Sequence, residues 1–315
     1  MNLRDLKYII AVAETHHFGQ AASRCFVSQP TLSGQIKKLE QTLGVTIFER
    51  TNRSVEITPI GEAILHHAYQ AIEQADAIEQ LALAHQDPLA GPLRIGAIPT
   101  LSPYLMPLIL MPLRRKHPQL KLILSEEMTD TLLHRLHNHE IDAALLATSV
   151  DDHDLQSVPL FTEPFWLAHP RQHWFYNREE ITLDDLDRTD MLLLSEGHCL
   201  ADQAMKICKM SDRKRQGEMA DLRASSLETL LQLVGAGFGS TLVPALALRG
   251  SWTTDSGVVA RKLDIPEAHR EVSIVYRKTF PREMSLQAFS QIIIDNLPNT
   301  VDRSKSKPVK PDNLA

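Results

Sequence analysis

Apolar side chains recur every three or four residues through the first part of the chain, which is the spacing of amphipathic helices. The pattern predicts a helix over 3–13, a shorter one that opens at Phe18 and a third over 31–43, with Pro30 well placed to begin it. The third segment has a polar opposite face and apolar positions expected to be buried, namely Leu32, Ile36, Leu39 and Leu43. Two short helices, a tight turn and a third helix with a polar face describe a helix-turn-helix.

Two short extended stretches follow the third helix. Residues 47–50 and 55–57 are predicted to pair as a wing that presents Arg50 and Arg53 at its tip. Basic side chains there suit contact with phosphates or insertion into a narrow minor groove. The alternative is a small helical bundle with a solvated face, which the helix spacing and the basic wing together disfavour.

A long apolar stripe then predicts one extended helix over 59–86. A lone helix of this length with an apolar stripe requires a partner, which fits pairing with a second copy of the chain. The residues 87–92 contain two prolines and a glycine, and they are expected to form a hinge and a domain boundary.

Beyond the hinge, short apolar stretches alternate with helical ones, a pattern typical of βαβ units and a parallel sheet. Strands are expected at 93–97, 120–126, 143–146, 165–168, 191–194 and 272–276. One helix is expected to follow residue 103 and to end at residue 117, and others are expected at 131–139, 226–236 and 285–296.

Charge is unevenly distributed along the 315 residues. Residues 1–57 and the tail from 301 each carry +2, so a total of −6 leaves about −10 for the middle of the chain. A basic head joined to an acidic body suits a nucleic-acid-binding domain fused to one with another ligand. The amino terminus resembles no signal peptide and no apolar run reaches the length of a membrane span, so we expect a cytoplasmic protein with no membrane partner.

The stretch FGQAASRCFVSQPTLSGQIKKLEQTLGVTIFERTNRSVEITPIGEAIL closely resembles the amino-terminal signature of LysR-type transcription regulators. The resemblance implies a winged helix-turn-helix (1–58), a linker and dimerisation helix (59–86), a hinge (87–92) and a regulatory domain (93–300). That domain would be α/β, two-lobed and periplasmic-binding-protein-like. The expected parts are lobe I at 93–163 and 268–300, lobe II at 164–267, and a disordered tail at 301–315.

The same resemblance implies which side chains meet double-stranded DNA. Those expected in the major groove are Ser28, Gln29, Pro30, Thr31, Ser33 and Lys37, with Arg50 and Arg53 supporting the wing. Gln29 is the best single candidate for direct base reading, because a glutamine pairs bidentately with adenine. Thr31, Ser33 and Lys37 are expected to mix base and phosphate contacts.

Two of the three cysteines lie in an informative segment. Cys199 follows Gly197 and His198 at the predicted start of a helix, where the helix dipole and a neighbouring histidine would lower the pKa of the thiol. Cys208 looks buried. Nine residues of one helix span about 13.5 Å, whereas a disulfide requires Cα atoms within about 7 Å. A bond between Cys199 and Cys208 therefore requires the segment to unwind.

The pattern G-H-C-L-x-D-Q-A-M-x-x-C resembles the signature of the OxyR-type peroxide sensors within the LysR family. By that resemblance Cys199 is the peroxidatic thiol and Cys208 resolves its sulfenic acid into a disulfide. Residues matching a peroxide pocket are Thr100, Thr129, Gly197, His198, Asp202 and Arg270, with His269 possible in place of Arg270. The polar, basic stretch 209–225 departs from an ordinary packed segment, so its packing is left open.

The resemblance further implies a homodimer or homotetramer on AT-rich promoter sites that activates antioxidant genes, with RNA polymerase and a cellular thiol reductant as partners. No metal and no cofactor is expected. The histidines around His134 lack the cysteine or carboxylate cluster that would complete a metal site. The glycines at 235–239 suit a helix-to-strand turn. Cys25 is expected to be a packing residue inside the second helix.

Three other interpretations remain. Cys199 and Cys208 could be two small core residues. The cleft between the lobes could bind a metabolite, with the cysteines incidental. A thiol peroxidase would also use a peroxide-reactive Cys199, although it would leave the helix-turn-helix unexplained.

Overall fold

A computed structural model describes residues 1–50, 55–84, 89–208, 224–249 and 257–303. The chain divides into two compact units, Met1–Asp87 and Pro88–Ala315. The first unit has one apolar core and the second has two, and the units are described separately below.

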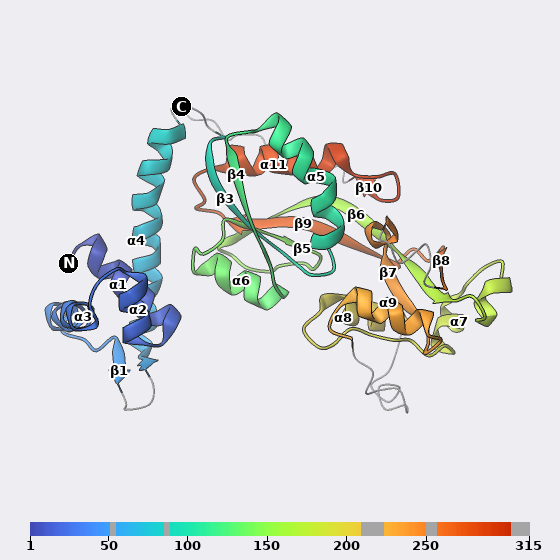
Figure 1. The fold of residues 1–315 in the computed structure, drawn as a ribbon, viewed down its shortest axis with the longest axis horizontal. Coiled ribbons are helices and arrows are strands. Elements are labelled where there is room, and N and C mark those ends of the chain that lie inside the picture. The colour runs from blue at the N-terminus through green and yellow to red at the C-terminus, as the bar shows by residue number, and fades with distance from the viewer. Residues whose placement is uncertain (51–54, 85–88, 209–223, 250–256, 304–315) are drawn as a thin grey trace. The chain divides into compact units, whose positions relative to one another are not determined.

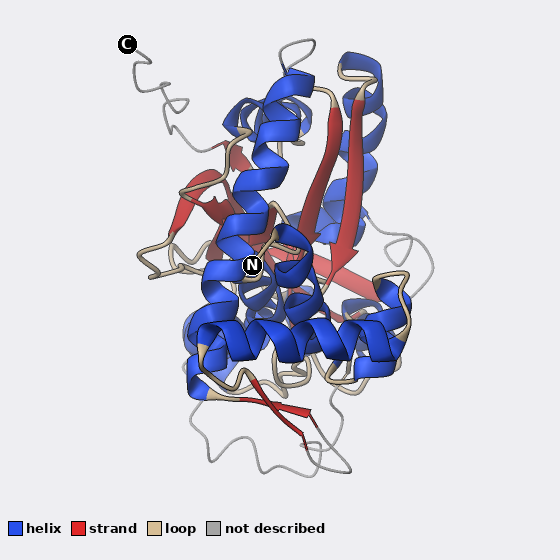
Figure 2. Cartoon of the chain, turned by 90° about the vertical axis from the view of Figure 1, so that its left-hand side faces the viewer, coloured by secondary structure: helices blue, strands red, loops and turns tan. Residues whose placement is uncertain are grey.

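The amino-terminal unit begins with three helices and a two-stranded wing. Their bounds are α1 Leu3–Thr15, α2 Phe18–Arg24, α3 Gln29–Leu43, β1 Phe48–Arg50 and β2 Val55–Ile57. The two strands pair antiparallel, and Figure 2 shows them side by side. The helix-turn-helix and its wing are thus confirmed. Arg53 and the side chain of Arg50 lie outside the described residues.

Local capping sets the helix ends and corrects three expectations. The Ser28 side chain accepts a hydrogen bond from Thr31 N, so α3 begins at Gln29 rather than at Thr31. Leu43 is 39% exposed, because it lies in the last turn of α3 beyond the packed core. Cys25 follows the last residue of α2 instead of lying within the helix, although it does pack against the core as expected.

The long helix α4 (Pro59–Ala84) confirms the predicted extended segment. Leu65 and Ala68 in its first half are buried against the core of the three helices. Farther along, Ile78 is 70% exposed. Within the described residues, the first part of α4 is therefore held by its own unit, while an apolar side chain of the second part is open to solvent.

The second unit contains a mixed sheet with the strand order β10-β6-β9-β5-β3-β4. β3 (Gly91–Ala97) pairs parallel with β4 (Leu120–Glu126) and β5 (Ala143–Leu146), as the alternating pattern predicted. β9 (His269–Arg277) pairs antiparallel with β5 and β6, so the sheet is mixed, and the predicted parallel pairing holds for β3, β4 and β5. The reason is topological. The chain leaves this sheet along β6, forms the strands that pair with the end of β6, and returns as β9 in the opposite direction to β5.

The strand β6 (Leu155–Pro170) links the two halves of this unit. Its first part pairs with β9, and its last part pairs with β7 (Thr241–Pro244) and β8 (Val258–Lys262). Figure 1 shows it passing from beside β9 to beside β7. The stretch predicted at 165–168 is only the end of this strand, while 191–194 forms isolated bridges at Met191 and Leu194.

Helices cover these strands, and two apolar cores result. The helices and 3₁₀ turns are α5 Ser102–Lys116, α6 Thr129–His137, η1 Trp174–Asn177, α7 Leu183–Asp187, α8 Cys199–Ile207, α9 Leu227–Gly235, η3 Ala245–Arg249 and α11 Glu283–Asn296. One core lies around β3, β5 and β9, and the other around α8, α9 and the end of β6. Ala245 and Leu246 pack in the first core, although the predicted lobe II would contain them.

The end of the chain also differs from expectation. Val301 is buried, and β10 (Asp302–Arg303) pairs antiparallel with β6, so the segment predicted to be disordered begins with ordered residues. Residues 304–315 lie outside the described part. None of the described helices is long and apolar enough to cross a membrane.

Candidate functional site

Cys199 is the first residue of α8, as predicted. Gly197, two residues earlier, has φ 93°, a left-handed conformation that favours glycine and turns the chain into the helix. His198 occupies the N-cap position but makes no capping hydrogen bond with its side chain. The backbone therefore places the thiol at a helix amino terminus, where backbone N–H groups favour an anion.

Arg270 forms the fixed positive charge of the site. Its Nη1 donates to Thr100 Oγ1 at 2.9 Å and its Nη2 donates to the Thr100 carbonyl at 3.0 Å. The guanidinium also pairs with Glu163 at 2.8 Å, and both side chains are completely buried. Glu163 and Arg270 face each other on β6 and β9, and Glu163 accepts a further bond from Leu246 N at 2.7 Å. This network fixes Arg270 rather than leaving it to solvent.

Opposing effects act on the pKa of Cys199. Burial raises it above its ordinary value, and the Asp202 carboxylate adds to that rise. The charge of Arg270 and the nearby Thr129 hydroxyl act in the opposite direction. The net shift is upward, so the predicted lowering of this pKa is wrong for the structure described. The physical reason is desolvation, which penalises the thiolate more than Arg270 and Thr129 favour it.

His198 does not supply the expected positive character. The residue is 3% exposed, and burial lowers the pKa of its imidazole. Its Nε2 lies 3.1 Å from the Ser225 carbonyl, so Nε2 carries the proton, and the buried Nδ1 has no partner among the described residues. His198 is therefore a neutral side chain that ties the start of α8 to the segment before α9.

The structure separates the remaining candidates for the peroxide pocket. Thr100 is buried, and the buried Thr129 hydroxyl lacks a regular hydrogen-bond partner in the described part yet lies close enough to Cys199 to lower its pKa. Asp202 is exposed one turn into α8, so it does not line a closed pocket. His269 is exposed and contacts the Pro266 carbonyl, which leaves Arg270 as the basic residue near the thiol.

Cys208 lies at the opposite end of the same helix, as its C-cap residue. It is 1% exposed, and burial raises the pKa of its thiol to about 11. Both thiols are free. With α8 continuous between them, the two Cα atoms are about 13.5 Å apart along the helix axis, so they cannot be joined in this fold.

Two partners of the site escaped the sequence reasoning. Glu163 is the only acid of the strand Leu155–Pro170 and is fully buried there, so it requires a buried partner. Tyr104 in α5 donates to Glu228 Oε1 in α9 at 2.6 Å, and Tyr104 packs against both cores. This bond joins the two halves of the unit, and the charge of Arg270 acts on the same hydroxyl, but no pattern in the sequence pairs residues so far apart.

The polar face of α3 is available for DNA. The side chains of Gln29, Thr31 and Lys37 are exposed, as are those of Ser28 and Pro30, whereas Ser33 is half-buried. The hydroxyls of Ser28 and Thr31 lie 2.7 Å apart and fix the first turn. Of the residues expected in the major groove, Ser28 to Ser33 lie at the amino-terminal end of α3 and Lys37 lies about two turns farther along it.

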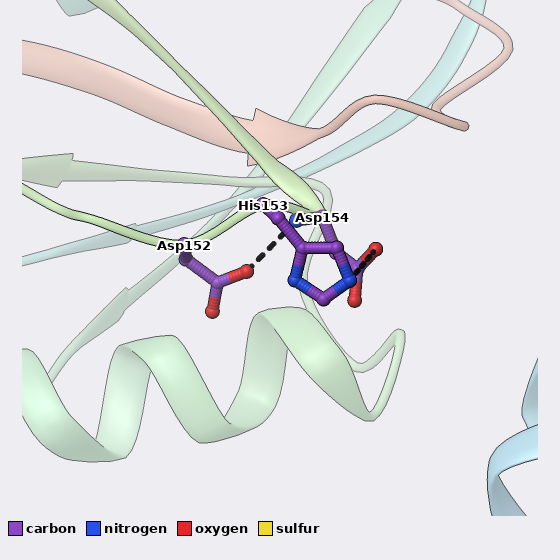
Figure 3. A group of neighbouring side chains, drawn as sticks. All are labelled: Asp152, His153 and Asp154. Atoms are coloured by element: carbon purple, nitrogen blue, oxygen red, sulfur yellow. Dashed lines mark hydrogen bonds and ion pairs between the residues drawn. The ribbon is translucent and has the colours of Figure 1, made fainter.

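One group of three residues in the described part of the chain has the spacing of metal ligands: Asp152, His153 and Asp154 (Figure 3). Asp152 already accepts a hydrogen bond from Asp154 N at 2.9 Å and contacts His137 Nε2 at 2.8 Å. These contacts close the turn before β6. The neighbouring His134 pairs instead with Asn138, so the cluster of histidines does not converge on one point.

Comparison with known proteins identifies the families that the two units of the chain match. Residues 3–62 match the bacterial regulatory helix-turn-helix of the LysR family, and residues 86–298 match the LysR substrate binding domain. A hydrogen peroxide-inducible genes activator of Dickeya chrysanthemi is 42% identical over 281 residues, which cover 89% of this chain and 91% of that protein.

Solved structures match as well. A full-length OxyR variant from Pseudomonas aeruginosa has a TM-score of 0.80 and 36% identity, covering 98% of this chain and 99% of that one. A peroxide-bound OxyR mutant from Corynebacterium glutamicum has a TM-score of 0.65 and 34% identity, covering 94% and 92% of the two chains. The chain belongs to the LysR family of helix-turn-helix regulators and is similar, within that family, to the OxyR proteins.

Proposed function

We propose that this protein is a peroxide-sensing transcription activator, switched by a reversible disulfide between Cys199 and Cys208. The observation that carries the proposal is the placement of Cys199 at the start of α8, near Arg270, with Cys208 buried at the other end of the same helix. The relatives named as hydrogen peroxide-inducible activators and the peroxide-bound structure support the choice of oxidant.

The proposed chemistry has two steps. The Cys199 thiol ionises, its thiolate attacks one oxygen of hydrogen peroxide, and the O–O bond breaks. The sulfur becomes a sulfenic acid, and the other oxygen leaves as hydroxide that takes up the proton released by the thiol and forms water. The Cys208 sulfur then attacks the sulfenic sulfur, forming the disulfide and releasing a second water. Two electrons pass from the two thiols to the peroxide. A cellular dithiol returns two electrons and two protons to restore both thiols.

The fold makes this chemistry a switch. Because α8 holds the two cysteines apart, the disulfide requires the helix to unwind between them. His198, at the start of this helix, contacts Ser225 near α9, so the change would reach the rest of the regulatory domain. We propose that the domain has two lobes, one formed by 93–163 with 268–300 and the other by 164–267. Their rearrangement would alter the spacing of paired DNA-binding units in a cytoplasmic homotetramer. The homotetramer binds AT-rich sites, where the activator recruits RNA polymerase.

DNA binding in this proposal uses Ser28, Gln29, Pro30, Thr31, Ser33 and Lys37, with Arg50 and Arg53 on the wing. Gln29 is exposed at the first position of α3, and a helix presents its amino-terminal residues to base edges in this motif. We assign the peroxide pocket to Thr100, Thr129, Gly197 and His198 beside Arg270, and we place Asp202 at its rim.

The region of DNA that the protein protects, with and without peroxide, tests the proposed function. We expect the reduced full-length protein to protect DNA and brief, low-dose peroxide to change the protected pattern. The Cys199→Ser variant should keep the reduced footprint in both conditions, because the attacking sulfur is gone. DNase I footprinting on a fragment that wild type selects from random DNA measures this, with Cys25→Ser as the matched control that should respond as wild type does.

Two further measurements, a footprint of Cys199→Ser with candidate metabolites and an assay of peroxide consumption, distinguish the other functions. If Cys199→Ser still changes its footprint with an inducer, the regulatory domain responds to a bound metabolite and the cysteines are incidental. Sustained consumption of peroxide with a thiol reductant, at many turnovers per protein, would favour a thiol peroxidase. We expect instead one peroxide consumed per reduction.

A further inference from the structure

The turn of the helix-turn-helix holds an aromatic residue in an unfavourable backbone conformation. After α2 the chain forms a complete Schellman motif: Val27 N donates to the Ala22 carbonyl at 3.0 Å and Phe26 N to the Ser23 carbonyl at 3.2 Å. Phe26 occupies the left-handed position of this motif, with φ 56°. Glycine is the usual residue there, because a side chain in this region crowds the following carbonyl.

Packing within the protein does not account for Phe26. Its neighbour Val27 packs against the core of the unit, whereas the side chain of Phe26, just before it, does not. Phe26 is 96% exposed. A single exposed apolar residue is ordinary on a protein surface. Here the exposure coincides with a strained backbone, so the position has two costs and no compensating contact with other described residues.

The position of Phe26 indicates what it contacts. It lies two residues before Ser28, the N-cap of α3, and two residues of chain span at most about 7 Å. In the proposed function the first turn of α3 enters the major groove, where the apolar feature of a base pair is the C5-methyl group of thymine.

We propose that Phe26 is a specificity residue that packs against a thymine methyl group at the edge of each half-site. The inference rests on the proposed DNA-binding function and adds a base contact that does not use hydrogen bonds. It explains why the turn retains phenylalanine where the local backbone favours glycine. Phe26 would then favour thymine over cytosine at its position, because cytosine lacks the methyl group.

The test combines one substitution in the protein with one in the DNA. A fragment selected by the full-length wild type is prepared with thymine or with uracil, which lacks only the methyl group. Loss of one buried methyl contact is worth about a factor of four, so two half-sites give about fifteenfold weaker binding of wild type to uracil DNA. Phe26→Gly should bind thymine DNA about fifteenfold more weakly, and its ratio between the two DNAs should fall to about twofold or less.

Stability and salt dependence separate this contact from a structural role. Phe26→Gly should raise the unfolding midpoint of the amino-terminal unit by about 4 °C, because glycine relieves the left-handed strain. The slope of log affinity against log salt should not change, since no phosphate contact is lost. Phe26→Leu should recover most of the affinity for thymine DNA. Leu43→Ala, at the exposed far end of α3, serves as the control and should bind within twofold of wild type.

The outcomes are distinct. If wild type and Phe26→Gly show the same ratio between thymine and uracil DNA, the thymine contact is wrong while the DNA-binding function stands. A lower unfolding midpoint in Phe26→Gly would also overturn the inference, because the phenylalanine would then be structural. If wild type selects no DNA at all, the proposed function fails, and this inference fails with it.

Discussion

Replacing Arg270 with methionine is expected to destabilise the regulatory unit by about 3–5 kcal/mol, because it leaves a carboxylate buried without its counter-charge. Arg270 and Glu163 are both fully buried and lie 2.8 Å apart. Glu163 would keep its bond from Leu246 N but lose the guanidinium. Urea unfolding of the full chain, followed by a probe in the regulatory unit, measures the change.

A double variant provides the control. Arg270→Met with Glu163→Gln removes both charges, so it should recover much of the stability lost by Arg270→Met alone. If the single variant is as stable as wild type, Glu163 is solvated and the buried pair does not hold this part of the site. The double variant also isolates the chemical role of Arg270: a folded protein whose Cys199 thiol reacts more slowly with peroxide is expected, since a charge that lowers its pKa is gone.

The rate at which Cys199 is oxidised is expected to rise about a hundredfold between pH 6 and pH 8. Peroxide reacts with the thiolate, and the pKa of Cys199 lies above its ordinary value because the thiol is buried. Below that pKa the thiolate fraction increases tenfold with each pH unit. The rate rises with pH because the raised pKa leaves the protonated thiol dominant from pH 6 to pH 8.

Stopped-flow oxidation of the Cys208→Ser variant measures this first step without the disulfide. Cys25→Ser in the same background controls for the remaining thiol. A rate that is flat from pH 6 to pH 8 would contradict the expectation, and it would mean that Arg270 and the start of α8 outweigh burial and already hold a thiolate.

Local signals were enough to predict the amino-terminal unit. Apolar spacing and the break before α3 are read within a few residues, and they place the three helices and the wing, although the Ser28 cap starts α3 two residues earlier than predicted. Gly197 and the residues after it likewise indicated the start of α8. Cys25 was placed inside α2 because the Schellman turn that ends this helix depends on backbone conformation rather than on side-chain type.

The rest of the site depends on contacts that local patterns do not carry. Arg270 meets Glu163 only because β6 and β9 pair in one antiparallel register, and Thr100 reaches the same guanidinium from a third segment. The neutral state of His198 follows from its burial against the Ser225 carbonyl. The pKa of Cys199 was misjudged for the same reason, because its desolvation is a property of the packed domain.

The proposed switch depends on the separation of the two cysteines by the helix α8. This helix positions Cys199 for oxidation, and in the same conformation it keeps Cys208 out of reach. Sulfenic acid formation would leave the reduced fold intact, whereas disulfide formation requires that fold to change. The two steps are therefore separable, and Cys208→Ser should stop at the first.

Peptide mapping by mass spectrometry under non-reducing conditions, after brief exposure of the full-length protein to low peroxide, tests this most directly. Wild type is expected to give a Cys199–Cys208 linked peptide that a thiol reductant removes, and Cys208→Ser a sulfenic acid on Cys199 that a dimedone probe traps. Oxidised protein in which Cys199 and Cys208 are both recovered as free thiols, or in which Cys25 alone is modified, would contradict it.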